Sequence, residues 1–288
     1  MSPATAQPSS STTTLPIIRK HRFPVPLLRL ELRDLSHEGS SLFLRHFHGY
    51  EDFEQQVQNV LSLLYNRPTS EELLDSTSND PTDTASKASD LLLRPGTRSI
   101  TMILQDYPGV AETDGMDLDP DHKTLRFSTA YIAARVKNNA AFDLRHEILG
   151  VVCHELVHCF QWNAEGTCNG GLIEGIADFV RLKAGLGAKH WKAPTRISEG
   201  ESWDAGYERT AFFLEFVEGR VGEGAVRRLN AGLREGVYDE RGLWEGVCGK
   251  KVGELWEQYG RDLERSAGGK GGDEDPPNPV PTHGVRVE

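Results

Sequence analysis

The chain has 288 residues and a formal net charge of −11, and 38% of its residues are hydrophobic. That length and apolar content predict one sizeable domain with its own core. The acidic balance argues against nucleic acid or an anionic membrane surface as a main partner, because both need a basic footprint. No run approaches the ~18 apolar residues of a membrane span.

Both ends of the chain and one internal stretch have the composition of unpacked segments. Residues 1–19 are rich in Ser, Thr and Pro, and residues 265–288 in Gly, Pro and acid, so we expect disordered tails around a domain over 20–264. Residues 67–89 predict an exposed loop. The N-terminus lacks a charged segment followed by an apolar one, so the default expectation is an intracellular protein. The four cysteines show no disulfide framework and no CxxC pattern, which predicts free thiols.

The N-terminal half mixes extended and helical patterns. Apolar runs predict strands over 27–32 and 41–47, and His46 and His48 are expected to alternate on a strand. The apolar spacing of residues 50–65 predicts a helix. Further extended segments are expected where β-branched and aromatic residues stand between turn signals, at 99–104 and 124–132.

From Asp143 onward the pattern is almost entirely helical. Asp143 is the expected N-cap of a helix that runs to about Trp162, and a second helix is expected over 172–184. Later helices are expected over 211–217, 225–233 and 252–263. The predicted fold class is therefore α+β, with a mixed sheet in the N-terminal half and a helical C-terminal half.

The first of these helices contains the motif HExxH within a strongly apolar run. His154 and His158 are four residues apart and lie one turn apart on a helix, so both can bind one ion. Glu155 lies about 100° round the helix from His154, where a general base for a metal-activated water belongs. A chance match or an ordinary buried His pair is the alternative. Burying two His and a Glu without a strong partner is costly, however, which favours one Zn²⁺ ion.

The second helix places Glu174 and Asp178 on one face, and a short connection lets it fold back on the first. Glu174 can then supply the third metal ligand, and Asp178 can accept the free ring N–H of a zinc-bound His. Asp178 as the ligand in place of Glu174 is the main alternative, and two exposed acids on an ordinary helix is another. Tyr207 is a candidate donor to the oxyanion of a tetrahedral intermediate, or a packed aromatic. Gln161 is expected to cap or brace the site.

Four blocks of the sequence closely resemble the plant basic secretory protein family, which has fungal and bacterial relatives: HELVHCFQWN (154–163), GGLIEGIADFVRLKAG (170–185), WDAGYERTAFFLEF (203–216) and GKKVGELWEQY (249–259). The similarity covers about residues 25–262. The Glu174–Asp178 spacing also resembles that of thermolysin-like peptidases.

The resemblance implies a zincin-like metallopeptidase fold, with a sheet packed beside the active-site helix. It implies His154 and His158 as metal ligands, Glu155 as catalytic acid and base, and the Glu174–Asp178 pair in the third-ligand region. The family name also implies secretion, against the intracellular expectation, and this chain is acidic rather than basic.

The sequence as a whole predicts a monomeric zinc metallopeptidase that acts on peptides or proteins, with Glu155 taking a proton from a metal-activated water. An extended peptide is expected to pair with an edge strand around residues 127–132. The alternatives are a zinc amidase with a non-peptide substrate, a zinc-stabilised binding module of defence type without turnover, and a metal-free helical scaffold. Glu155 favours an enzyme, because a purely structural metal site needs no base.

Overall fold

The computed structural model describes residues 23–65, 94–137, 139 and 141–268. The predicted N-terminal tail and the predicted loop over 67–89 lie outside these residues, as does the predicted C-terminal tail from residue 269 onward. The tail was expected to begin at residue 265, but residues 265–268 continue the last helix.

Four strands form a mixed sheet in the described part of the N-terminal half. In spatial order they are β1 (Leu27–Leu32), β2 (Ser99–Gln105), β4 (Asp119–Ser128) and β3 (Ala111–Met116). β1 and β4 run parallel to β2, whereas β3 pairs antiparallel with β4 and forms an edge of the sheet. The predicted strands over 27–32 and 99–104 are confirmed.

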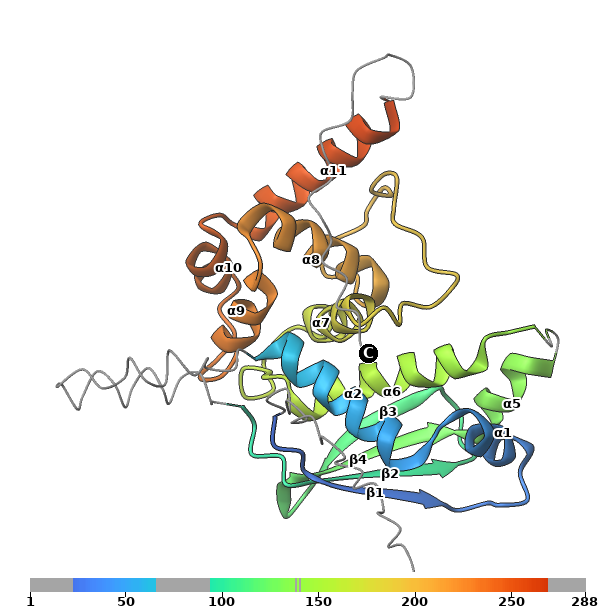
Figure 1. The fold of residues 1–288 in the computed structure, drawn as a ribbon. Coiled ribbons are helices and arrows are strands. Elements are labelled where there is room, and N and C mark those ends of the chain that lie inside the picture. The colour runs from blue at the N-terminus through green and yellow to red at the C-terminus, as the bar shows by residue number, and fades with distance from the viewer. Residues whose placement is uncertain (1–22, 66–93, 138, 140, 269–288) are drawn as a thin grey trace, which may run out of the picture.

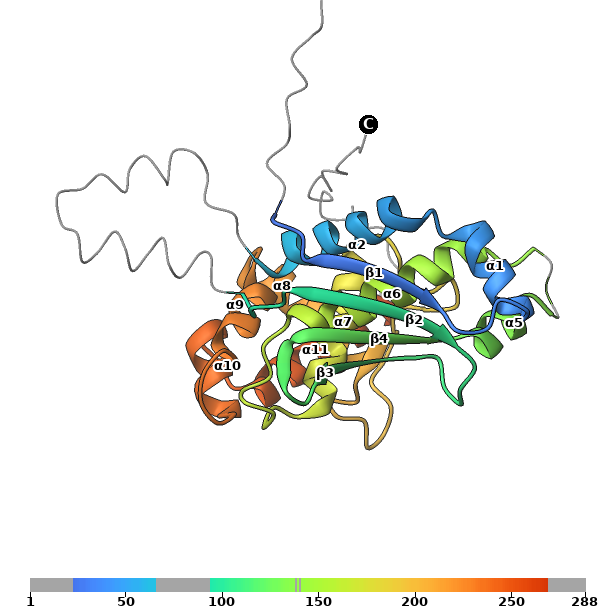
Figure 2. The ribbon, with the colours of Figure 1, turned by 90° about the horizontal axis from the view of Figure 1, so that it is seen from below.

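One face of this sheet is covered by helices, and alternate residues along each strand face them. On β2, Ile100, Met102 and Leu104 are completely buried, as the period of two along a strand requires. Helices α2 (Gly49–Leu64) and α6 (Leu144–Phe160) lie over this face (Figures 1 and 2). The predicted helix over 50–65 is confirmed, and so is the N-cap of α6, because the Asp143 side chain accepts a hydrogen bond from His146 N.

One predicted extended segment is wrong and a second extends too far, because local caps start helices there. Residues 41–46 belong to helix α1 (Glu38–His46), whose first turn is capped by the His37 side chain accepting from Gly39 N, and Phe47 is its C-cap. His46 is thus the last residue of α1 and His48 precedes α2, so the two do not alternate on a strand.

The second segment is 124–132, of which residues 124–128 are confirmed as part of β4. β4 ends at Ser128, whose hydroxyl accepts a hydrogen bond from Tyr131 N and so starts helix α5 (Thr129–Lys137). The edge strand expected around 127–132 is therefore misplaced. β4 is an inner strand of the sheet, and β3 forms the edge beside α6.

The C-terminal half is helical, as predicted. Its elements are α7 (Gly170–Lys183), α8 (Tyr207–Val221), α9 (Ala225–Gly232), α10 (Glu240–Cys248) and α11 (Val252–Gly268). Among these helices, α10 was not predicted from the sequence periodicity. α7 lies against α6, and α8 lies against α7 on the side away from the sheet (Figure 1).

Two glycines of α7 allow this close packing. A Cβ atom on Gly175 would lie 2.2 Å from Thr210 Cγ2 of α8, and one on Gly171 would lie 1.8 Å from the Asp204 carbonyl oxygen. The segment before α8, and with it Tyr207, is therefore held close to the start of α7.

Two further observations concern the cysteines and the membrane. All four cysteines are free, as predicted, and Cys153 and Cys159 are buried. Among the described helices, none is long and apolar enough to cross a membrane.

Candidate metal centre

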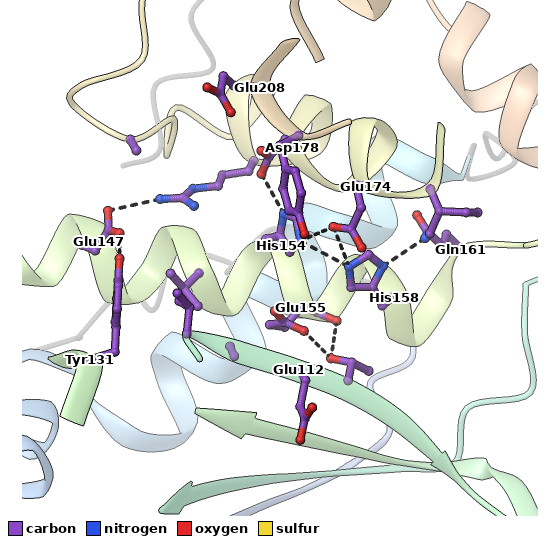
Figure 3. A pocket seen from close by; sticks show the side chains of 18 of the residues that line it. Glu112, Tyr131, Glu147, His154, Glu155, His158, Gln161, Glu174, Asp178 and Glu208 are labelled. Carbon is purple, nitrogen blue, oxygen red and sulfur yellow. Dashed lines mark hydrogen bonds and ion pairs between the residues drawn. The ribbon is translucent and has the colours of Figure 1, made fainter. Parts of the chain in front are cut away.

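Helix α6 lies at the centre of the molecule, between the sheet and α7. Its apolar residues face almost every direction, and Ile148, Val152 and Leu156 are completely buried. α7 runs beside it in the opposite sense, because Glu174 lies near His158 and Arg181 near Glu147. Polar side chains of the two helices therefore meet along one seam (Figure 3).

Three possible ligand atoms converge in this seam. His154 Nε2 lies 3.2 Å from His158 Nε2 and 3.1 Å from Glu174 Oε2, and His158 Nε2 lies 3.6 Å from the same oxygen. These three residues are the group of His, Cys, Asp and Glu side chains, among those described, that could hold a metal ion. The structure thus brings together the three residues that the sequence predicted as ligands.

The spacing of these atoms fits a zinc ion. Nitrogen and oxygen ligands lie about 2.0–2.2 Å from Zn²⁺, and two such ligands in a tetrahedral arrangement lie about 3.4 Å apart. The three observed separations, 3.1, 3.2 and 3.6 Å, bracket this value. Two imidazoles and one carboxylate are also a donor set of catalytic zinc sites, which keep a fourth position open.

Asp178 contacts the opposite side of the His154 ring. Its Oδ1 lies 2.7 Å from His154 Nδ1, and the carboxylate is almost completely buried. Because an ionised carboxylate can only accept, Nδ1 carries the hydrogen and Nε2 faces the convergence point. Asp178 therefore contacts the ring nitrogen away from the convergence point, whereas Glu174 carries the carboxylate at that point.

The electrostatics of the seam favour a cation at Nε2 of His154. Burial lowers the pKa of His154, but hydrogen bonds to Asp178 and Glu174 outweigh it and raise that pKa to about 9. Burial alone would raise the pKa of Glu174, but hydrogen bonds to His154 and His158 hold it well below its ordinary value. The same interactions stabilise either a proton or a metal ion at this point.

His158 has a neutral partner, Gln161, at the C-cap of α6. Gln161 Nε2 lies 3.0 Å from His158 Nδ1, while its Oε1 is buried and has no hydrogen-bond partner among the described residues. A half-turn of the carboxamide exchanges its two ends. When Nε2 of His158 binds a metal, Nδ1 carries the hydrogen, and the carbonyl end of Gln161 can accept it. The bracing role expected of Gln161 would therefore act through His158 Nδ1.

Glu155 faces the edge strand rather than the convergence point. The Thr113 hydroxyl of β3 lies 2.8 Å from Glu155 Oε2 and 3.1 Å from the Glu155 main-chain oxygen. Thr113 therefore fixes the Glu155 carboxylate, which lies on the side of α6 that faces the sheet (Figure 3). Sequence reasoning missed Thr113, because β3 (AETDGM) has no apolar alternation that would mark it as a strand.

Tyr207 begins α8 and covers the His154 ring. The two rings are stacked, with centroids 6.1 Å apart, and Tyr207 is 55% exposed. Its φ of 47° lies in the left-handed region, which is uncommon for an aromatic residue and often accompanies a functional position. The negative charge of Glu174, followed by burial, raises the pKa of its hydroxyl, which therefore stays protonated as a donor.

These residues open onto a cleft of about 820 Å³ between β3, α6 and α7. Towards the N-terminal end of α6, the cleft is lined by Tyr131, Glu147, Arg181 and Trp191. Glu147 accepts from the Tyr131 hydroxyl and pairs with Arg181, whose guanidinium stacks on the Trp191 ring. No sequence pattern marks this group, because its members come from four separate segments.

A family model described as a peptidase of plants and bacteria matches residues 25–259. No significant match was found among curated proteins or among solved structures. The match spans most of the chain, including β1 to β4 and the whole α6–α7 seam. The chain therefore belongs to the basic secretory protein family of plant and bacterial peptidases.

Proposed function

We propose that this chain is a zinc-dependent metallopeptidase with a zincin-like domain, in which His154, His158 and Glu174 hold one Zn²⁺ ion. The observation that carries the proposal is the convergence of their three ligand atoms, with separations of 3.1–3.6 Å, at the floor of a cleft. Membership of a peptidase family supports a peptide or protein substrate.

A Zn²⁺ ion held there supplies a Lewis acid for the scissile carbonyl and lowers the pKa of water. Glu155 acts as the general base: its carboxylate, held by Thr113, takes a proton from the attacking water and passes it to the leaving amine. Tyr207, kept protonated, donates a hydrogen bond to the developing oxyanion. Asp178 and Gln161 orient the two imidazoles.

The substrate lies along β3. The side of β3 away from β4 borders the cleft, and its residues Ala111 to Gly115 line it. An unpaired strand edge offers main-chain donors and acceptors to an extended peptide, which binds as an added strand. Thr113 lies in the middle of this stretch, so a peptide on β3 passes directly over Glu155.

The test compares the native chain with Glu155→Gln for zinc content and for cleavage of an unbiased peptide library. Glu215→Gln, which changes an exposed acid on α8, is the matched control. We expect Glu155→Gln to keep its zinc and to lose cleavage by at least a hundredfold, the scale of a lost general base. If Glu155→Gln cleaved the library as well as the native chain, Glu155 would not be the general base. Zinc without cleavage in the native chain would instead indicate a metal-stabilised binding module.

A further inference from the structure

Lys123 breaks the apolar pattern on the buried face of the sheet. It lies on β4, in alternation with Leu125 and Phe127, which are completely buried against the helices. A charged residue at a core-facing strand position is unfavourable unless it has a specific role. Lys123 is half-buried and lines the cleft.

The strand register shows how the lysine reaches the cleft. Across the sheet, Lys123 lies between Ile100 of β2, which is completely buried, and Gly115 of the edge strand β3. A Cβ atom on Gly115 would lie 3.6 Å from Lys123 Nζ. Because Gly115 has no side chain, the ammonium group can pass over the edge strand into the cleft while its aliphatic stem stays against the sheet.

The ammonium group has no ion-pair partner in the part of the chain that the structure describes. Lys123 forms no hydrogen bond and no ion pair with the described residues. The other lysine or arginine that lines the cleft, Arg181, is paired with Glu147. A half-buried ammonium with three free donors therefore faces the space that a substrate would occupy.

Lys123 also lies close to the reacting centre. The next core-facing residue on β3 is Thr113, which holds Glu155. Residues two apart on a strand are about 7 Å apart, so the position on β3 beside Lys123 lies roughly two residues of an extended peptide away from the position that holds the base. It lies towards the C-terminal end of α6, where Gln161 and Asn163 also line the cleft.

We propose that Lys123 is a specificity-determining residue that binds a carboxylate of the peptide lying along β3. The inference rests on the proposed peptidase function and adds a substrate class, peptides with a negative charge at this subsite. The carboxylate is either an Asp or Glu side chain or the free C-terminus of the peptide. Gly115 keeps the path to the subsite open.

The test measures binding rather than turnover, with the Glu155→Gln protein loaded with zinc. The probes are eight-residue Ala- and Gly-based peptides, acetylated and amidated, with a single Glu at each position in turn, and the same peptides with Gln. A further set of Gln peptides has a free C-terminus. Lys123→Met, which keeps the aliphatic stem, and Gly115→Val, which blocks the path, are compared with Arg29→Met, an exposed cation on β1.

We expect one Glu position, or the free C-terminus, to strengthen binding by about fivefold over its neutral counterpart, the effect of a partly exposed ion pair. The peptide set that binds more strongly shows whether the carboxylate is a side chain or the free C-terminus. The gain should disappear in Lys123→Met and Gly115→Val and remain in Arg29→Met. Two results would overturn the inference: equal binding of charged and neutral peptides, including no binding of either, or a gain that survives in Lys123→Met. The proposed function is judged separately, from the zinc content and cleavage of the native chain.

Discussion

Removing the carboxylate of Asp178 should weaken zinc binding without displacing any of the three proposed ligands. Asp178 is 2% exposed, and its Oδ1 lies 2.7 Å from His154 Nδ1. Asp178→Asn keeps an acceptor but loses the charge, and Asp178→Ala loses both. The two variants therefore separate the hydrogen bond from the charge.

The magnitude follows from the type of bond. A hydrogen bond to a charged group contributes about 1.5–3 kcal/mol. Loss of a partner behind a metal-ligating His weakens metal affinity by about 10- to 100-fold, or roughly 1.4–2.7 kcal/mol, which agrees. We expect Asp178→Asn to lie near the tenfold end and Asp178→Ala near the hundredfold end.

The assay is competition for zinc with a chromogenic chelator at pH 8, with folding checked by circular dichroism. Asp52→Asn is the control, because Asp52 is also buried and also has a positively charged partner, Arg145, but lies on α2. Its zinc affinity should equal that of the native chain. A zinc dissociation constant for Asp178→Ala within twofold of the native value would refute the role assigned to Asp178.

Four further predictions concern His154, Gln161 and Gly175. Because the pKa of His154 is raised to about 9, protons compete with zinc below that pH, and apparent affinity should fall about tenfold per pH unit from 9 to 7 in chelator titrations. In the metal-free chain, protonation of His154 adds to the free energy of unfolding, fully below pH 6.5. This contribution should be lost as the pH rises through about 9, which denaturant titrations at several pH values would measure. Gln161→Glu, which can only accept from His158 Nδ1, should tighten zinc binding at pH 8, whereas Gln161→Met should weaken it about tenfold; the same affinity in both would count against the bracing role. Gly175→Ala should lower the free energy of unfolding by about 1–3 kcal/mol in urea titrations, because its Cβ would overlap Thr210, and an unchanged midpoint would mean that α8 can shift.

The positions of the motif residues were predictable because they depend on short-range geometry. The four-residue spacing in HExxH and in the Glu174–Asp178 pair places side chains on one helical face whatever the rest of the fold does. The N-cap at Asp143 is equally local, and the structure confirms it. Sequence alone left the third ligand open between Glu174 and Asp178, since that choice depends on how α7 lies against α6.

The errors and omissions depend on long-range or side-chain-specific effects. Residues 41–47 have an apolar pattern that suits a strand, but the His37 cap and packing against α5 make residues 41–46 part of a helix. β3 is polar because it borders the cleft, so no periodicity marks it. Thr113 and Lys123 acquire their positions only through the register of β3 with β4, which a single sequence does not reveal.

X-ray absorption at the zinc edge, on protein purified without added metal, would examine the proposed coordination itself. We expect one zinc per chain with two imidazole nitrogens and a carboxylate oxygen at about 2.0–2.2 Å. His158→Ala should lose one nitrogen and most of the bound metal. A chain that contains no stoichiometric zinc, or a zinc ion with sulfur neighbours at about 2.3 Å, would contradict the site of His154, His158 and Glu174.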